Sequence, residues 1–267
     1  MNSPMLIPKI EESPILRVKN LNKLYGINRG CQDINFNLFP GEVLGIVGES
    51  GSGKSTLLKS LSGESEPDTG NIIFNSSING EKNLYQVDEA QRRLLMRSEF
   101  GIVKQNPRDG LRLRVSAGAN IGERLMAVGQ QHYGEIRRTA TDWLEHVEIE
   151  GDRIDDFPYS FSGGMQQRLQ IARVLVTEPR LVLMDEPTGG LDVSVQARLL
   201  DLVRSLVTEL QLSVVMVTHD LAVARLLCHR LLVMKKSRVV ESGLTDQILD
   251  DPQHPYTQLL VSSVLTP

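Results

Sequence analysis

The sequence predicts an α/β fold in which a parallel-sheet core with a phosphate-binding loop carries a small antiparallel β subdomain and an α-helical lobe. Three observations predict it. A glycine-rich turn lies directly between an apolar run, Glu42 to Val47, and a helix-forming run, Lys54 to Ser62, as in a phosphate-binding βα unit. Two more apolar runs, Leu181 to Met184 and Ser213 to Val217, are typical of parallel strands covered on both faces. Between these halves, residues from about 108 to 176 have mainly helical patterns.

The other segments are taken in chain order from the N-terminus. Residues 1–13 contain prolines and adjacent acidic residues without apolar periodicity, and we expect a mobile leader there. Short alternating segments from Ile15 to Phe39 predict antiparallel strands, and Pro40-Gly41 would turn the chain into the core. The main domain is then expected at 14–243, followed by a C-terminal tail at 244–267. A chain of 267 residues is long enough for one such elaborated domain.

Charge and hydropathy disfavour several classes of function. With 29 basic and 33 acidic residues, the net charge of −4 gives no general attraction to nucleic acid or anionic lipid, so we expect no nucleic-acid partner. No apolar run approaches the roughly 20 residues of a membrane-spanning helix, and we expect a cytoplasmic protein without direct membrane insertion. Cys31 and Cys228 lack metal-ligand spacing and are interpreted as ordinary reduced thiols.

A phosphate-binding loop follows the first buried strand. Eight residues fit the pattern G-x-x-x-x-G-K-[ST], and they are Gly48, Glu49, Ser50, Gly51, Ser52, Gly53, Lys54 and Ser55. Glycines let backbone N–H groups point at phosphate oxygens, and the N-terminus of the next helix adds positive potential. Lys54 would reach the β- and γ-phosphates, the Ser55 hydroxyl would ligate Mg²⁺, and Thr56 would lie near the phosphates. The loop by itself predicts nucleotide binding only.

Polar residues also end the other predicted strands. Asp185 and Glu186 follow one of them, at the sheet edge where ligands of open α/β sheets bind. We expect Asp185 to hold Mg²⁺ and Glu186 to polarise the water that attacks the γ-phosphate. A solvated strand end or a helix cap is the other common reason for such a pair. His219 could contact the γ-phosphate, and Gln105 could orient the water or the metal; a histidine or glutamine that is only a hydrogen-bonded residue at a strand end is the more common alternative for each.

A second anion-binding turn lies further along the chain, at the start of a predicted helix. It consists of Ser162, Gly163, Gly164, Met165 and Gln166. Its hydroxyl and free N–H groups would bind a phosphate, yet the first loop already holds this chain's own nucleotide, so a second nucleotide is implied. With this turn the chain resembles the ATP-binding cassette (ABC) family, whose signature is Leu-Ser-Gly-Gly-Gln. Here Phe161 replaces the leucine, and Met165 precedes the glutamine.

The resemblance covers nearly the whole chain and implies an ABC nucleotide-binding domain. In that family two cassettes pair head to tail, and the signature of one closes on the γ-phosphate held by the loop of the other. It therefore implies a homodimer that hydrolyses ATP with Mg²⁺, and catalytic roles for Lys54, Glu186 and His219. The family's adenine-stacking aromatic matches Tyr25, for which packing in the β layer is the alternative, and its dimer-contact loop ends at Asp192.

Family membership does not name the machine that the ATPase drives. Repair and chromosome-maintenance members carry coiled coils or zinc modules, and this sequence has neither heptad runs nor cysteine clusters. The tail from Asp251 to Leu260 resembles peptide-importer ATPases, although the chain stops soon afterward without their cysteine-bearing extension. The stretch from Gln105 to Met126 and the segment from Asp185 to Gln196 look like the ATP-binding subunits of bacterial carbon-phosphorus lyase systems.

Two functions follow from these resemblances. One is an ATP-binding subunit that docks on the soluble carbon-phosphorus lyase core during phosphonate degradation, and the alternative is the ATPase of a peptide or phosphonate importer. Nothing in the sequence resembles an iron-sulfur or radical-cofactor site, so we do not expect this chain to break the carbon-phosphorus bond itself. Three basic residues could serve docking or belong to an ordinary solvated turn, and they are Arg108, Arg112 and Arg114.

Overall fold

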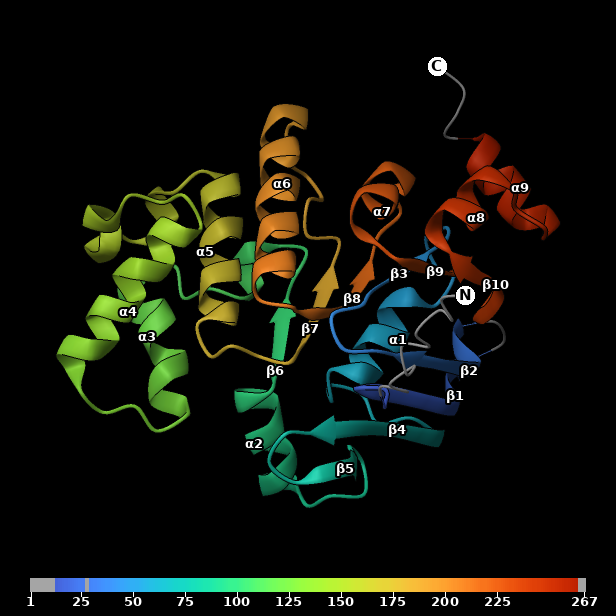
Figure 1. Ribbon diagram of the computed structural model, residues 1–267, viewed down its shortest axis with the longest axis horizontal. Coiled ribbons are helices and arrows are strands. Elements are labelled where there is room, and N and C mark those ends of the chain that lie inside the picture. Colours follow the sequence, from blue (N-terminus) through green and yellow to red (C-terminus); the bar gives the residue numbers. More distant parts are fainter. Residues whose placement is uncertain (1–12, 27–28, 264–267) are drawn as a thin grey trace, which may run out of the picture.

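The computed structural model describes residues 13–26 and 29–263, so the predicted leader lies outside the described residues apart from Ser13. Its centre is a six-stranded sheet in the order β10-β9-β3-β8-β7-β6 (Figure 1). Its strands are β3 (Val43–Val47), β6 (Phe100–Val103), β7 (Leu181–Asp185), β8 (Ser213–Val217), β9 (Arg230–Lys235) and β10 (Arg238–Leu244). Neighbouring strands are parallel except for β9 and β10, which are antiparallel. Every residue of β3 and β8 is buried, as the apolar runs predicted.

A second sheet covers one face of the molecule. It is antiparallel, in the order β2-β1-β4-β5. Its strands are β1 (Leu16–Gly26), β2 (Arg29–Leu38), β4 (Thr69–Ser76) and β5 (Gly80–Asn83). The first helix, α1 (Lys54–Leu61), contacts strands of both sheets. Its Leu57 and Leu61 are buried in one apolar cluster with Leu16 of β1 and Leu44 of β3, so this cluster fixes the helix that begins at the phosphate loop.

Helices cover the other face of the central sheet. Alternate residues of β7 serve the two faces, because Leu181 and Leu183 lie in the cluster with α1 while Val182 and Met184 lie in the cluster with the helices. These helices include α5 (Gly163–Leu175), α6 (Val193–Glu209) and α7 (Leu221–Leu227). The predicted helical lobe lies at one end of the molecule (Figure 1). Its elements are η1 (Pro107–Asp109), α3 (Ala117–Ala127), α4 (Tyr133–His146), η2 (Gly151–Asp155), η3 (Pro158–Ser160) and α5.

Three further helices complete the fold. Helix α2 (Glu89–Ser98) leads into β6 and contacts it. Helices α8 (Thr245–Asp250) and α9 (Pro255–Ser262) pack against the core, where Ile248 and Tyr256 are buried in the same apolar cluster as α5 and α6. The segment that was set apart as a tail at 244–267 therefore contributes ordered helices to the main apolar cluster, and the boundary at 243 stays a prediction.

The predicted fold class is confirmed, with a parallel core, an antiparallel subdomain and a helical subdomain. Helix α4 begins at Tyr133, where the His132 side chain caps it by accepting a hydrogen bond from the Glu135 N–H at 3.2 Å. Cys31 and Cys228 are buried free thiols, and burial raises the pKa of Cys228 to about 12. Within the described part of the chain, no helix is long and apolar enough to cross a membrane.

Candidate functional site

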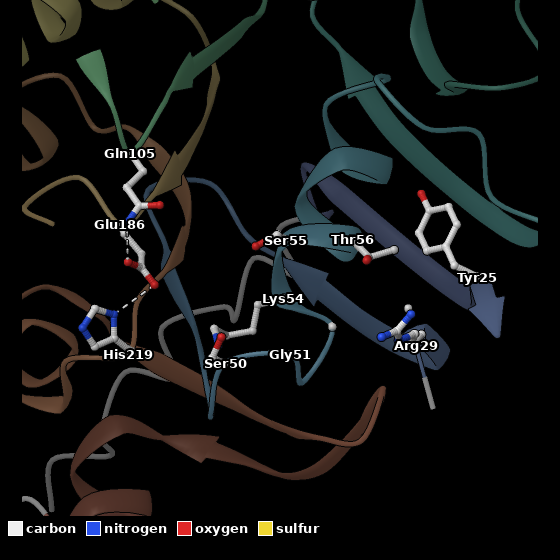
Figure 2. Close-up of a pocket in the computed structure, with 12 residues that line it drawn as sticks. Tyr25, Arg29, Ser50, Gly51, Lys54, Ser55, Thr56, Gln105, Glu186 and His219 are labelled. Carbon is white, nitrogen blue, oxygen red and sulfur yellow. Dashed lines mark hydrogen bonds and ion pairs between the residues drawn. The ribbon is translucent and has the colours of Figure 1, made fainter. Parts of the chain in front are cut away.

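A pocket of about 690 Å³ brings the predicted nucleotide-site residues together (Figure 2). The phosphate loop forms its floor, residues that follow β6, β7 and β8 form one wall, and the β1–β2 end of the antiparallel sheet forms the opposite wall. The lining residues are Tyr25, Arg29, Gly30, Ser50, Gly51, Gly53, Lys54, Ser55, Thr56, Gln105, Glu186 and His219. Only Arg29 and Gly30 of this set were not predicted from the sequence.

Two glycines explain the shape of the phosphate loop. Gly48 has φ 147° and Gly53 has φ 108°, in the region that L side chains rarely adopt. A Cβ at Gly53 would lie 1.9 Å from the carbonyl oxygen of Gly30, and a Cβ at Gly48 would lie 2.2 Å from that of Met234. The loop is therefore held between the start of β2 and the end of β9, and a side chain at either glycine would force these segments apart.

Lys54 lies buried beneath the loop, with 6% of its surface exposed. Its ammonium donates to the carbonyl oxygens of Gly48 at 2.7 Å and Glu49 at 2.8 Å. Burial lowers the pKa of Lys54, and the nearby carboxylates of Glu186 and Asp185 oppose that shift. The charge therefore sits between the loop and the acidic pair, with contacts that phosphate oxygens could replace.

The N-terminus of α1 opens into the same pocket. Gly53 is its N-cap and offers no side-chain acceptor, so the N–H groups of the first turn are not capped by a side chain. Figure 2 shows the Ser55 hydroxyl on the side of the pocket that faces Glu186. Free N–H groups, a helix N-terminus and a buried ammonium at one point form an anion-binding site of the kind that receives phosphates.

The carboxylate of Glu186 is held from two sides. The Nδ1 of His219 lies 2.9 Å from Oε1, and the Nε2 of Gln105 donates to Oε2 at 2.9 Å (Figure 2). Glu186 has φ 42°, an uncommon value for a residue with a side chain, and its N–H donates to the Val217 carbonyl oxygen at 2.8 Å. This backbone turn, pinned to β8, points the side chain into the pocket. Three strands thus bring Gln105, Glu186 and His219 together.

The oxygen ligands suit Mg²⁺ shared with a phosphate. Ser55, Asp185 and Gln105 supply a hydroxyl, a carboxylate and an amide oxygen, the types that Mg²⁺ prefers. No group of three or more His, Cys, Asp or Glu side chains in the described ranges is arranged to hold a metal alone. Mg²⁺ usually keeps several waters and binds one or two carboxylates with substrate phosphates, so the site fits this ion on those terms. Burial and the neighbouring Glu186 raise the pKa of Asp185, and three lysines oppose the shift.

Tyr25 stands on the opposite wall with 61% of its surface exposed. Its hydroxyl lies 3.0 Å from the Ser65 Oγ, and the Lys23 ammonium lies 5.6 Å from the ring centroid. These contacts orient the ring, and an exposed ring at the mouth of a phosphate site offers a surface on which a base could stack. Packing in the β layer does not account for such exposure. Arg29 lines the same wall and adds a positive charge.

The signature turn lies outside this pocket. Ser162 caps α5 and is exposed, and its Oγ accepts from the Met165 N–H at 3.3 Å. Gln166 is buried and donates to the carbonyl oxygens of Pro158 and Phe161, so it supports the turn from within. A second pocket of about 360 Å³ joins Gly163 and Gln166 to Gln105 and to the loop before Asp192. Ser162 does not line the pocket of Lys54 in the described part of the chain, and its predicted contact across a dimer stays a prediction.

Known proteins are similar to this chain in sequence and in fold. The family model described as "ABC transporter" matches residues 31–189, which is more than half of the chain. The ATP-binding protein PhnK of Escherichia coli (strain K12), named for phosphonates utilization, is 67% identical over 252 residues, covering 94% of this chain and 98% of that protein. The dipeptide transport ATP-binding protein DppF of Haemophilus influenzae is 35% identical, covering 95% of this chain and 79% of DppF. A model of the oligopeptide/dipeptide transporter C-terminal region also matches residues 240–267.

Solved structures agree with these matches. The chain superposes on cbiO1 of Clostridium perfringens, part of an ABC transporter complex, with a TM-score of 0.76 at 31% identity, covering 90% of this chain and 92% of cbiO1. It also superposes on a dimeric post-hydrolysis state of the ATP-binding cassette MJ0796 bound to ADP and Pi, with a TM-score of 0.75 at 29% identity, covering 86% and 98% of the two chains. The family predicted from the phosphate loop and the signature is therefore confirmed. This chain belongs to the ATP-binding cassette family of ATPases.

Proposed function

We propose that this chain is the ATP-hydrolysing subunit of a phosphonate-degrading system, in which two copies pair head to tail and hydrolyse MgATP at their shared interface. The observation that carries the ATPase part is the single pocket in which Lys54 lies opposite Glu186, with Gln105 and His219 bound to that carboxylate. The phosphonate part is supported by the 67% identity to PhnK over nearly the whole of both chains.

The chemistry follows from the two contacts of Glu186. A carboxylate oxygen has more than one lone pair, so Glu186 accepts from Gln105 and His219 and still accepts the proton of a water. That water forms the new bond to the γ-phosphorus while the bond to the ADP oxygen breaks, and its proton passes to Glu186. His219 and Gln105 keep the carboxylate aimed at one point, which is the positioning that hydrolysis needs.

The loop residues bind and orient the nucleotide. Lys54 exchanges its two backbone acceptors for β- and γ-phosphate oxygens, and the N–H groups at the start of α1 bind the same oxygens. Ser55, Asp185 and Gln105 would hold Mg²⁺, which would neutralise negative charge on the phosphates. Tyr25 would stack on the adenine, since its exposed ring lines the pocket.

Dimerisation completes the site from the partner's signature turn. Ser162 and Gly163 are exposed at the start of α5, where the helix N-terminus favours a phosphate. Asp192 is exposed at the N-cap of α6 and makes no capping hydrogen bond with its side chain, so it is available to a partner chain. In the paired state these residues would lie over the γ-phosphate that the other copy's Lys54 holds.

The proposed larger partner is the soluble carbon-phosphorus lyase core, which would hold the dimer in the cytoplasm. Arg108 and Arg114 are exposed on the segment that follows Gln105, whereas Arg112 forms an ion pair with Glu123 at 2.8 Å. The first two are therefore better docking residues than Arg112. Because this segment begins at Gln105, closure around ATP would shift it and change the affinity for the core, by a coupling free energy of about 1 to 3 kcal/mol.

A pull-down of the purified lyase core tests this docking. The Glu186→Gln protein, which would hold ATP without turnover, is expected to bind the core with an affinity that differs between MgATP and no nucleotide. Arg108→Glu is expected to weaken docking, and Lys19→Glu on β1 is the matched control, because it makes the same charge change at an exposed site of the antiparallel sheet. Equal docking by both variants, each with intact MgATP binding, would exclude Arg108 from the docking surface.

The ATPase of a peptide or phosphonate importer is the second candidate function. It is favoured by the match of residues 240–267 to the C-terminal region of oligopeptide/dipeptide transporters and by the 35% identity to DppF. The two candidates share the catalytic site and differ in their partner. Absence of core binding in every nucleotide state, together with co-purification of a permease from membranes, would decide for the importer.

A further inference from the structure

A buried glutamine of α5, the signature helix that begins at Ser162, forms hydrogen bonds to the backbone just before Gln105. Gln170 lies two turns after the start of α5 and is fully buried, with 0% of its surface exposed. Its Oε1 accepts from the Lys104 N–H at 2.7 Å, and its Nε2 donates to the Lys104 carbonyl oxygen at 3.1 Å. One amide side chain therefore satisfies both backbone groups of a single residue.

Neighbouring groups fix this amide in place. Gln167, also buried, accepts from the Gln170 Nε2 at 3.2 Å and donates to the same Lys104 carbonyl oxygen at 3.4 Å. The chain after Gln105 then passes close over the amide, because a Cβ at Gly110 would lie 2.4 Å from the Gln170 Oε1. Lys104 and Gly110, at the two ends of this segment, thus both lie against the Gln170 side chain of α5.

The position of Lys104 explains why its hydrogen bonds to Gln170 affect the site. β6 is an edge strand whose last paired residue is Val103, so the backbone groups of Lys104 lie beyond the ladder and take their partners from α5. Lys104 directly precedes Gln105, whose Nε2 donates to Glu186 (Figure 2). A rotation of the Lys104 peptide would move the Gln105 side chain relative to Glu186.

We propose that Gln170 is a positioning residue: its two hydrogen bonds to Lys104 set Gln105 against Glu186 and tie that contact to the signature helix. The inference rests on the proposed ATPase function. A continuous set of contacts runs from Ser162 through α5 to Gln170, Lys104, Gln105 and Glu186. Movement of the signature helix on dimer closure is thereby passed to the hydrolytic carboxylate of the same chain, without contact between Gln170 and nucleotide.

A purely structural role is the competing explanation, and the fold supplies a matched control for it. Asn120 in α3 is also 0% exposed, and it makes the same pair of bonds to the backbone of Arg112, at 2.8 and 3.1 Å. Asn120 therefore holds a backbone segment of the helical lobe with equivalent hydrogen bonds. Its partner Arg112 lies eight residues earlier in the sequence and is not in contact with Glu186. Loss of either amide removes hydrogen bonds from partly buried backbone groups and costs stability.

The test compares Gln170→Met with Asn120→Leu in the full chain. Both variants are expected to lower the melting temperature. Only Gln170→Met is expected to lower kcat, by about 10- to 100-fold, because small misplacements of a catalytic group have effects of that size. Its Kd for MgATP should stay within about twofold of wild type, since the phosphate loop is untouched. Equal kcat values for the two variants, per mole of folded protein, would overturn the proposal.

A second variant covers the case in which Gln170→Met does not fold. Gln170→Glu keeps an acceptor for the Lys104 N–H but sets an oxygen against the Lys104 carbonyl oxygen unless the new carboxyl is protonated. Its kcat relative to wild type should therefore rise as pH falls from 8 to 6, because burial raises the pKa of such a carboxyl. A ratio that is independent of pH contradicts the proposal. Failure of wild type and Asn120→Leu to hydrolyse ATP would instead refute the ATPase function.

Discussion

Neutralising Glu186 is the most direct test of the catalytic site. Glu186→Gln keeps the size and the backbone position of the side chain, including the turn at φ 42°. It removes the negative charge that accepts the proton of the attacking water. Loss of a general base of this kind lowers the rate by about 10²- to 10⁴-fold, or about 3 to 5 kcal/mol in the activation free energy.

The structure predicts that nucleotide binding survives the change. Glu186 raises the pKa of Asp185, so its neutralisation lowers that pKa and leaves Asp185 more fully ionised for Mg²⁺. Removing a carboxylate from the wall that faces Lys54 also removes repulsion against the γ-phosphate. One contact must change, because an amide nitrogen at the Oε2 position would face the donor Nε2 of Gln105 at 2.9 Å. That conflict is avoided when the amide oxygen takes the Oε2 position and the amide nitrogen faces the Nδ1 of His219, which accepts in its other neutral tautomer, so the Gln105 oxygen stays available to Mg²⁺.

Three measurements check this reasoning. Steady-state turnover should fall by at least 100-fold, the Kd for MgATP should be equal to or lower than that of wild type, and an ATP-bound dimer should accumulate in size-exclusion chromatography. Glu89→Gln, on the exposed start of α2, is the control for loss of one carboxylate. Turnover of the Glu186→Gln protein within about tenfold of wild type would refute the role of Glu186 as the base.

Two further predictions separate binding, pairing and loop support. Lys54→Ala is expected to weaken MgATP binding, as measured by titration. Ser162→Arg is expected to leave binding of MgATP to the monomer intact and to prevent ATP-dependent dimerisation, as measured by light scattering. Normal dimerisation and turnover of the Ser162→Arg protein would refute the shared site. Tyr256→Phe removes the hydroxyl that accepts a hydrogen bond from the Glu49 N–H at 3.0 Å. The melting temperature should therefore fall by about 2–4 °C, and the affinity for MgATP should fall a few-fold. Tyr159→Phe is the control, because the Tyr159 side chain is 65% exposed, and it should change neither quantity.

Much of the fold could be predicted because its central strands are continuous apolar runs. The predicted Leu181 to Met184 and Ser213 to Val217 match β7 and β8 to within one residue. The hairpin of β9 and β10 was not predicted. Most residues of β10 are only partly buried, and its sequence mixes arginine, glutamate, serine and glycine, so it carries no clean alternation.

The site was predictable where its residues are contiguous or end a strand. The residues of the phosphate loop are contiguous, so the motif itself predicts their geometry. Gln105, Glu186 and His219 each follow a parallel strand, and the carboxyl ends of parallel strands lie at one edge of the sheet. Arg29 and Gly30 were missed because their place depends on how the antiparallel sheet packs on the loop. The only sequence signal was the glycine itself, whose φ of 130° lets β2 approach Gly53.

Contacts that end on backbone atoms leave even less trace in a sequence. Gln170 lies 66 positions from Lys104, and its partners there are an N–H and a carbonyl oxygen that every residue type except proline would offer. No pairing of side-chain types reveals such a bond. What the sequence does show is a glutamine placed among the apolar residues Leu169, Ile171 and Ala172 of this helix, all of which are buried. Buried amides need partners for all their polar atoms, so a polar residue in such a place implies a neighbouring backbone group whose position it fixes.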